Sequence, residues 1–252
     1  MRIFIIIICL TIINFCHGQG SRLEHFTFHS KSLDEPREIC VYFPENYTID
    51  SSYSVLFCTD GQLINEQYQS KLDSVFHLKI VNPFVIVGVY SNEKQVNTYL
   101  EYRNFEYTEN RTSDNPDLNS RFQRHLNFFV HEVDEYVKNE LKLKIGNRYF
   151  YGVSNGAGFG VSMSKYYPQL FSKYILYSTA GENYHKLKWD SNKYPFFIMK
   201  CGNEEPEPFI EGSRKLSKYL SKKHYKHLFE IYNGGHKRED WLNLFIYDVK
   251  IL

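Results

Sequence analysis

The stretch Tyr149-Phe-Tyr-Gly-Val-Ser-Asn-Gly-Ala-Gly158 is the most informative part of this 252-residue chain. It carries a G-x-S-x-G pattern, formed by Gly152, Ser154 and Gly156, between a short apolar run and a helix-like segment. In a strand–turn–helix of this kind the glycines leave room where backbone crosses closely, and the serine hydroxyl is raised above the edge of a sheet. At an average usage of about 7% for Gly and Ser, a chain of this length would contain the pattern by chance roughly one time in twelve. The prediction of a nucleophilic Ser154 therefore depends on partners elsewhere in the chain.

Apolar runs bounded by turn residues predict the strands of a sheet around this stretch. Leu23–His29 and Glu38–Phe43 alternate with period two and are typical of an antiparallel pair. The other runs are more continuously apolar: Ser54–Thr59, Phe84–Tyr90, Tyr149–Val153, Lys173–Ser178, Pro195–Cys201 and Leu228–Tyr232. Continuous runs indicate strands that are covered on both faces, as in a parallel sheet.

Helical patterns fall between these runs. In Arg121–Leu141 the apolar residues recur at steps of three and four, which predicts one buried helix face. Further helices are predicted at Gly156–Tyr167, Pro208–Lys222 and Asp240–Leu252. The alternation of strands and helices indicates an α/β domain with right-handed crossovers. The polar segment Ser91–Asn119 lacks clear periodicity and is predicted to be a long loop that borders the functional site.

Composition bounds the size and the class of the protein. The chain is 42% hydrophobic and 23% charged, which is ordinary for one large α/β domain or two small ones. No linker, repeat or low-complexity tract divides it, so we predict a single domain over residues 19–252. The formal charge of +1 argues against a nucleic acid as partner.

The N-terminal segment has one early positive charge followed by a short apolar block. Residues 1–18 are predicted to be a secretory signal peptide, so that the mature protein is exported and has no stable membrane insertion. A lipid anchor on Cys16 and an uncleaved N-terminal anchor are the alternatives.

Three cysteines lie outside this segment, at positions 40, 58 and 201. All three fall in strand-like runs and are predicted to be buried free thiols, whereas a bridge between Cys40 and Cys58 stays open in an exported protein.

A nucleophilic serine needs a histidine base, and that base needs an acid to hold its tautomer. In α/β hydrolases these follow in the order serine, acid, histidine. Of the histidines downstream of Ser154, His236 follows Asn233-Gly-Gly directly after the last predicted strand, which places it at a strand's C-terminal end. His224 and His227 have metal-ligand spacing but lack a third ligand, so we predict no metal and no cofactor.

The acid is expected after the strand Pro195–Cys201, where Glu204, Glu205 and Glu207 crowd one turn. The sequence predicts where the acid lies but not which of these glutamates it is. Acidic residues at this place are also explained by the helix dipole, which favours negative charge in a first helical turn. Backbone N–H groups must face a developing oxyanion. One is expected from Asn155, and the other from the loop Thr59–Gln62, where a plain β-turn is the alternative.

Several segments together resemble one family. Tyr53-Ser-Val-Leu-Phe-Cys-Thr-Asp-Gly-Gln62 is similar to the strand and loop of the "putative esterase" branch of α/β hydrolases, which includes enterochelin, feruloyl and acetylxylan esterases, S-formylglutathione hydrolases and mycolyltransferases. Val85–Val89 with Arg103–Tyr107, Asn147–Gly158 and Tyr167–Lys173 resemble its later segments. The similarity runs over nearly the whole mature chain and implies an α/β-hydrolase fold. That fold has a mostly parallel eight-stranded sheet, an antiparallel N-terminal strand pair and helices on both faces.

The resemblance also implies roles for individual residues. It makes Ser154 the nucleophile, His236 the base and Glu205 the acid, with Glu204 as the next choice. It implies that Gln62 is the second oxyanion donor and that substrate is bound by a further set: Asp60, Gly61, Arg103 and Trp241. Asn155, Ala157 and the spacing between His236 and Trp241 depart from the family pattern, and this leaves the substrate undetermined.

These patterns predict a serine carboxylic ester hydrolase that acts on a small-molecule ester, including carbohydrate- or siderophore-linked esters. An acyltransferase using a sugar acceptor and a non-catalytic ligand-binding homologue are the alternatives. A histidine base must be neutral to act, so the rate should fall as the pH drops through about 6–7. The oligomeric state is not predicted.

Overall fold

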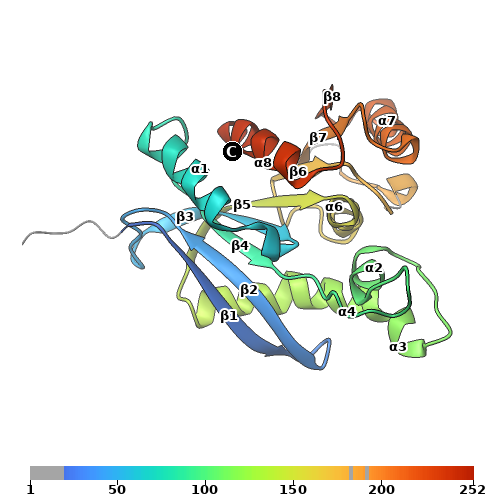
Figure 1. Cartoon of the computed structure of the whole chain (residues 1–252), viewed down its shortest axis with the longest axis horizontal. Coiled ribbons are helices and arrows are strands. Elements are labelled where there is room, and N and C mark those ends of the chain that lie inside the picture. The colour runs from blue at the N-terminus through green and yellow to red at the C-terminus, as the bar shows by residue number, and fades with distance from the viewer. Residues whose placement is uncertain (1–19, 182–183, 191–192) are drawn as a thin grey trace, which may run out of the picture.

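The computed structural model describes residues 20–181, 184–190 and 193–252 (Figure 1). The predicted signal peptide and Cys16 lie outside the described residues. In the described part, the strands form an eight-stranded sheet in the order β1-β2-β4-β3-β5-β6-β7-β8. The strands are β1 (Arg22–Ser30), β2 (Glu35–Phe43), β3 (Ser52–Thr59), β4 (Val85–Val89), β5 (Lys144–Val153), β6 (Lys173–Tyr177), β7 (Phe196–Gly202) and β8 (His227–Tyr232).

The pairing confirms the predicted α/β-hydrolase architecture. β1 and β2 are antiparallel, and β2 is also antiparallel to β4. All pairs from β4 through β3, β5, β6 and β7 to β8 are parallel. The carboxyl ends of the parallel strands therefore meet at one edge of the sheet, where polar side chains from distant segments can converge.

Helices cover both faces of the sheet, because successive strand residues point to opposite sides. On one side Phe57 packs in a cluster with residues of α4 (Arg121–Asn127), α6 (Asn155–Tyr166) and α7 (Glu207–Lys222). On the other side Leu56 and Cys58 pack against α1 (Glu66–His77) and α8 (Arg238–Asp248). Figure 1 shows α1 and α8 together above the sheet and α4 beneath it.

The predicted helix at Arg121–Leu141 differs in detail. It consists of α4, a π-helical segment at Phe128–Glu132 and α5 (Val133–Asn139), so it ends before Leu141. The prediction that Ser91–Asn119 is a loop was wrong in part. This segment contains α2 (Tyr102–Tyr107) and α3 (Pro116–Asn119), and α2 begins with a capping box in which Glu101 and Asn104 satisfy each other's backbone N–H.

The helix α1 was not predicted at all. Its N-cap is Asn65, whose side chain accepts hydrogen bonds from the N–H groups of Gln67 and Tyr68. The three cysteines outside the N-terminal segment are buried free thiols, as predicted. None of the helices in the described ranges is both long and apolar enough to cross a bilayer.

A buried ion cluster ties α2 and α4 to β2. The carboxylate of Glu106 accepts hydrogen bonds from Arg37 at 2.5 Å and from Arg121 at 2.8 Å, and Arg121 also pairs with Glu35. The Glu106 side chain is 0% exposed. His125 lies 3.6 Å from Glu106, is fully buried among aromatic rings, and neither of its ring nitrogens has a hydrogen-bond partner among the described residues.

The pKa values in this cluster follow from burial and charge. Burial would raise the pKa of Glu106, but the charge interaction with His125 and the charges of Arg37 and Arg121, together with the Arg37 hydrogen bond, outweigh it and lower that pKa to about 2. Burial lowers the pKa of His125 to about 3. His125 is therefore neutral at pH 7, and Arg37 and Arg121 supply the charge that Glu106 balances.

Replacing Glu106 by Gln should lower the free energy of unfolding by about 3–5 kcal/mol, because two buried guanidinium groups lose their common carboxylate. Urea denaturation at neutral pH measures this. Glu211→Gln is the matched control, since Glu211 pairs with Lys215 on the exposed face of α7 and its loss should leave the midpoint unchanged.

The same pair of proteins gives a pH test. A lowered carboxyl pKa stabilises the fold above the ordinary Glu value of 4.5, and this contribution is lost as the pH falls towards 2. The stability difference between wild type and Glu106→Gln should shrink over that window. A difference that stays constant would contradict the role of the cluster.

Candidate active site

The turn after β5 has the strained geometry expected of a nucleophile elbow. Ser154 lies between β5 and α6 with φ 54° and ψ −129°, a conformation that is costly for a residue with a side chain. A Cβ on Gly152 would lie 2.6 Å from the carbonyl oxygen of Gly156. A Cβ on Gly156 would lie 2.3 Å from the Thr59 hydroxyl. Gly152 is thus required by a close backbone approach, as the sequence predicts, whereas Gly156 is required because the side chains of Thr59 and Asp60 pack against it.

The loops after β7 and β8 are held against each other by backbone contacts. The N–H of Asn203 donates to the carbonyl of Tyr232 at 2.9 Å, and the N–H of Glu204 donates to that of Gly234 at 2.9 Å. A Cβ on Gly202 would lie 2.2 Å from the Gly234 carbonyl oxygen. This close approach brings the acidic turn after β7 beside the loop that carries His236.

Three side chains from these loops form a hydrogen-bonded chain. The Nε2 atom of His236 lies 3.2 Å from Oγ of Ser154. Its Nδ1 atom lies 2.9 Å from Oε2 of Glu205. With the ring proton on Nδ1, His236 donates to the carboxylate and its Nε2 can accept the serine proton. The three residues are far apart in sequence and meet at the carboxyl edge of the sheet.

The carboxylate of Glu205 is buried and well supplied with donors. Its side chain is 0% exposed. Its Oε1 atom accepts hydrogen bonds from the Ser178 hydroxyl at 2.6 Å and from the Gly202 N–H at 2.8 Å. Burial would raise the pKa of Glu205, but the hydrogen bonds from His236, Ser178 and Gly202 outweigh it and hold that pKa below its ordinary value. Glu205 therefore stays ionised at neutral pH.

The three glutamates that the sequence leaves as candidate acids differ in burial. Glu204 and Glu207 are exposed, whereas Glu205 is buried against His236. Glu207 lies 3.8 Å from Arg214, on the surface of α7. The difference arises because the turn after Gly202 directs one side chain inward and its neighbours into solvent.

Aromatic rings flank the imidazole of His236. Phe209 packs against it with ring centroids 4.6 Å apart, and Trp241 packs edge-on at 4.7 Å. Trp241 is buried, and its indole N–H donates to the Ser178 hydroxyl at 3.2 Å. Ser178 and Phe209 were not singled out from the sequence. The only signal for Ser178 is that it is a polar residue at the end of a predicted strand.

The loop after β3 lies next to the elbow and is fixed by an ion pair. Asp60 has a left-handed conformation with φ 54° and is followed by a short 3-10 helix, Gly61–Leu63. Its carboxylate accepts two hydrogen bonds from Arg103, at 2.6 and 2.8 Å. Its N–H donates to the hydroxyl of Tyr107 at 3.2 Å. A Cβ on Gly61 would lie 2.4 Å from the Gly88 carbonyl oxygen, so this position also requires glycine.

Two residues expected to donate to an oxyanion lie in the first turns of helices. Asn155 begins α6, and Gln62 lies in the 3-10 helix, so their N–H groups belong to first turns that lack partners within the helix. The side chain of Gln62 points elsewhere and donates to Glu93 at 2.9 Å. The side-chain amide of Asn155 donates to the Thr108 hydroxyl at 3.4 Å.

The four residues predicted to bind substrate have other contacts in the free chain. Asp60 and Arg103 bond to each other, Trp241 bonds to Ser178, and Gly61 packs on Gly88. Substrate contact by these residues stays a prediction. The two histidines with metal-ligand spacing lie elsewhere, since His227 lies in β8 and bonds to Ser217 at 2.9 Å, while His224 is exposed beyond α7.

Comparison with known proteins identifies the family of this chain. Residues 30–252 match the model of the family described as "Putative esterase". The chain belongs to this family. It is accordingly a carboxylic ester hydrolase with an α/β-hydrolase fold.

Relatives support the fold over nearly the whole chain. The uncharacterized protein YjcH of Bacillus subtilis is 26% identical over 245 residues, which cover 88% of this chain and 94% of YjcH. A ferulic acid esterase from Anaeromyces mucronatus is 13% identical with a TM-score of 0.71, over 92% of this chain and 90% of that one. The siderophore hydrolase EstA from Aspergillus nidulans is 15% identical with a TM-score of 0.69, over 91% and 94% of the two chains.

Replacing Gly202 by Ala should lower the free energy of unfolding by about 1–3 kcal/mol, because the new methyl group must displace the backbone of the histidine loop. Gly212→Ala is the matched control. Gly212 lies in α7, where the added Cβ would be 4.0 Å from its nearest neighbour, the Thr179 carbonyl. That change should be neutral or stabilise by about 0.5–1 kcal/mol. Equal effects of the two substitutions in urea denaturation would contradict the close packing of the two loops.

Proposed function

We propose that this carboxylic ester hydrolase is a serine esterase in which Ser154 is the nucleophile, His236 the base and Glu205 the acid. The observation that carries the proposal is the continuous chain of hydrogen bonds from the Ser154 hydroxyl through His236 to the buried Glu205 carboxylate. A serine hydroxyl is a weak nucleophile at neutral pH, and a positioned imidazole removes its proton as the new bond forms.

The first step forms an acyl-enzyme. The Ser154 oxygen attacks the ester carbonyl while His236 takes the hydroxyl proton at Nε2. The tetrahedral intermediate then expels the alcohol, which leaves with that same proton from Nε2. Glu205 stabilises the positive imidazolium through the hydrogen bond at Nδ1, and its lowered pKa keeps it negative throughout.

The second step repeats the chemistry with water. His236 removes a proton from water, the hydroxide attacks the acyl carbonyl, and the proton is returned to Ser154 as the carboxylic acid departs. In both steps the N–H groups of Gln62 and Asn155 donate to the negative oxygen. Because both groups are fixed at first turns of helices, they are oriented before the charge develops.

We also propose roles for the residues around this chain of hydrogen bonds. Asp60 and Arg103 position the loop that carries the Gln62 N–H, and Trp241 and Ser178 position His236 and Glu205. As substrate we propose a small or carbohydrate- or siderophore-linked ester. The support is that relatives of the same fold include a ferulic acid esterase and a siderophore hydrolase. Export of the protein is proposed from the signal-like pattern of residues 1–18.

Ser154→Ala should reduce hydrolysis of p-nitrophenyl acetate by about 10⁴-fold or more without changing the fold. Glu205→Gln should reduce it by about 10²–10⁴-fold, because the imidazolium loses its buried negative partner. Glu204→Gln and Glu207→Gln are the matched controls, because each removes one negative charge close to Glu205 in sequence. Both should retain wild-type rates. A Ser154→Ala enzyme with wild-type activity would overturn the proposal, and a large loss in Glu204→Gln with none in Glu205→Gln would reassign the acid.

Asp60→Asn and Arg103→Met should each lower kcat by about tenfold or more, because the oxyanion loop loses its ionic anchor. The double variant should be no slower than the worse single variant, since both changes break the same pair. A double-mutant cycle on kcat measures this. Simple addition of the two losses would show that the residues act separately.

A further inference from the structure

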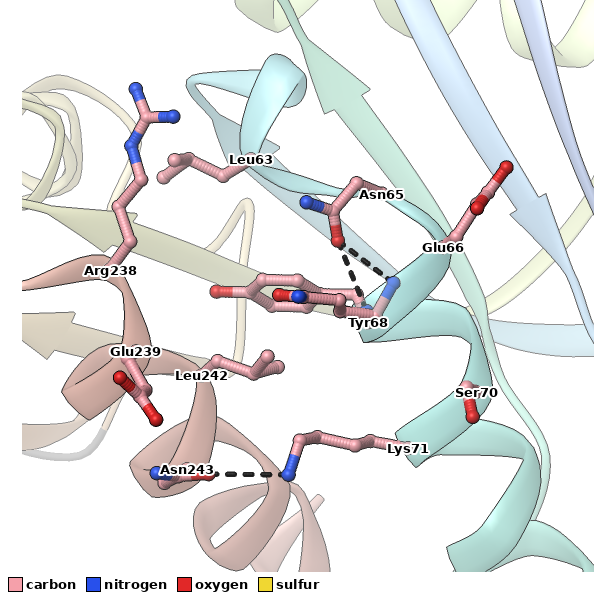
Figure 2. Close-up of a pocket in the computed structure, with 11 residues that line it drawn as sticks. Leu63, Asn65, Glu66, Tyr68, Ser70, Lys71, Arg238, Glu239, Leu242 and Asn243 are labelled. Carbon is pink, nitrogen blue, oxygen red and sulfur yellow. Dashed lines mark hydrogen bonds between the residues drawn. The ribbon is translucent and has the colours of Figure 1, made fainter.

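A large pocket with polar and apolar walls lies between α1 and α8. It has a volume of about 820 Å³, and Figure 2 shows its walls. Leu63, Tyr68 and Leu242 supply the apolar part of its lining, whereas Arg238, Glu66, Glu239, Lys71 and Asn243 supply charged and polar groups. A pocket of this size can hold a drug-sized molecule or the larger part of an ester.

Two residues at one end of this pocket are close in sequence to the proposed catalytic residues. Leu63 directly follows Gln62, the proposed oxyanion donor. Arg238 lies two residues after His236, so their Cα atoms are at most about 7 Å apart. Figure 2 shows the Leu63 and Arg238 side chains together at this end, with Lys71 and Asn243 at the opposite end.

Among the described residues that line the pocket, Arg238 supplies the positive charge at the end formed with Leu63. Arg238 is exposed, and no carboxylate in the described ranges lies within ion-pair distance of it. In Figure 2 it extends away from Glu239 and towards Leu63, while Glu66 stands on the opposite wall. Lys71 is engaged differently, since its ammonium donates to Asn243 at 3.3 Å.

We propose that this pocket binds the leaving-group part of the ester, and that Arg238 recognises a carboxylate on that part. The inference rests on the proposed function, since it takes Ser154 and His236 as the reacting groups. His236 must protonate the departing alcohol, so the alcohol side of the ester lies next to the segment that continues into Arg238. A guanidinium presents a rigid fork of donors that matches a carboxylate, which makes Arg238 a specificity-determining residue.

The charge balance of the pocket limits what it accepts. Glu66 and Glu239 line the middle, and Lys71 lies at the far end. A leaving group with one carboxylate near the reacting bond pairs with Arg238 and keeps its remaining atoms against neutral or weakly polar walls. A group with further negative charge along its length would meet the two glutamates and be repelled.

A matched pair of acetyl esters tests the proposal: meta-acetoxybenzoate, whose leaving phenol has a carboxylate, and meta-acetoxybenzamide, its neutral counterpart. The measured quantity is the ratio of kcat/KM for the acid to kcat/KM for the amide. This ratio should fall by about fivefold to tenfold in Arg238→Gln, because a charge-assisted hydrogen bond is lost. Comparing the two enzymes cancels the intrinsic reactivity of the esters.

Lys237→Gln is the control, because Lys237 is exposed, adjacent in sequence and not part of the pocket lining. It should leave the ratio unchanged. Raising the salt concentration to about 0.5 M should lower the wild-type ratio and leave that of Arg238→Gln unchanged. Free meta-hydroxybenzoate should also inhibit wild type more strongly than it inhibits Arg238→Gln, which tests binding without turnover.

An unchanged ratio in Arg238→Gln would overturn the inference. An equal fall in Lys237→Gln would also overturn it, because it would show that any nearby positive charge has the same electrostatic effect. These outcomes are separate from failure of the proposed function. If both enzymes hydrolyse the neutral amide-bearing ester and Ser154→Ala does not, the serine mechanism stands whether or not Arg238 selects the carboxylate.

Discussion

The hydrogen bond between the buried Glu205 carboxylate and His236 is the interaction on which the site depends. A buried carboxylate is stable only where several donors replace its lost water. Here Ser178, the Gly202 N–H and His236 provide them, so the ends of β6, β7 and β8 are joined through one side chain. The same contacts fix the orientation of the imidazole, with its second nitrogen directed at Ser154.

Close backbone packing makes this arrangement possible. Gly202 lies against Gly234, and Gly152 lies against the backbone of Gly156. Gly156 in turn leaves room for the side chains of Thr59 and Asp60, so the elbow packs against the loop after β3. On the other side of the elbow, the Asp60–Arg103 ion pair links that loop to α2. The buried cluster around Glu106 then anchors α2 to β2. The site is therefore held from two directions, by the strand ends and by a helical segment that the sheet alone would not fix.

Much of the fold could be predicted from local sequence patterns. The eight strands are continuous or alternating apolar runs, and the family resemblance supplied their arrangement. Ser154 and His236 could be named as candidates from the sequence because glycines and strand ends mark their positions. The acid was harder to assign, because Glu204, Glu205 and Glu207 have the same chemistry and only the direction of each side chain distinguishes them. The helix α1 was missed because its first turns are polar. The helix α2 was missed because it has only six residues, and one of its buried residues, Glu106, is polar and pairs with Arg37 of β2.

The most direct test of the central claim is intact-protein and peptide mass spectrometry after reaction with a fluorophosphonate. Such a reagent traps a serine that a neighbouring imidazole activates. We expect one covalent adduct per chain, located on Ser154, and little labelling when His236 is replaced by Ala. An adduct on another residue, or full turnover of esters with no adduct at Ser154, would contradict it.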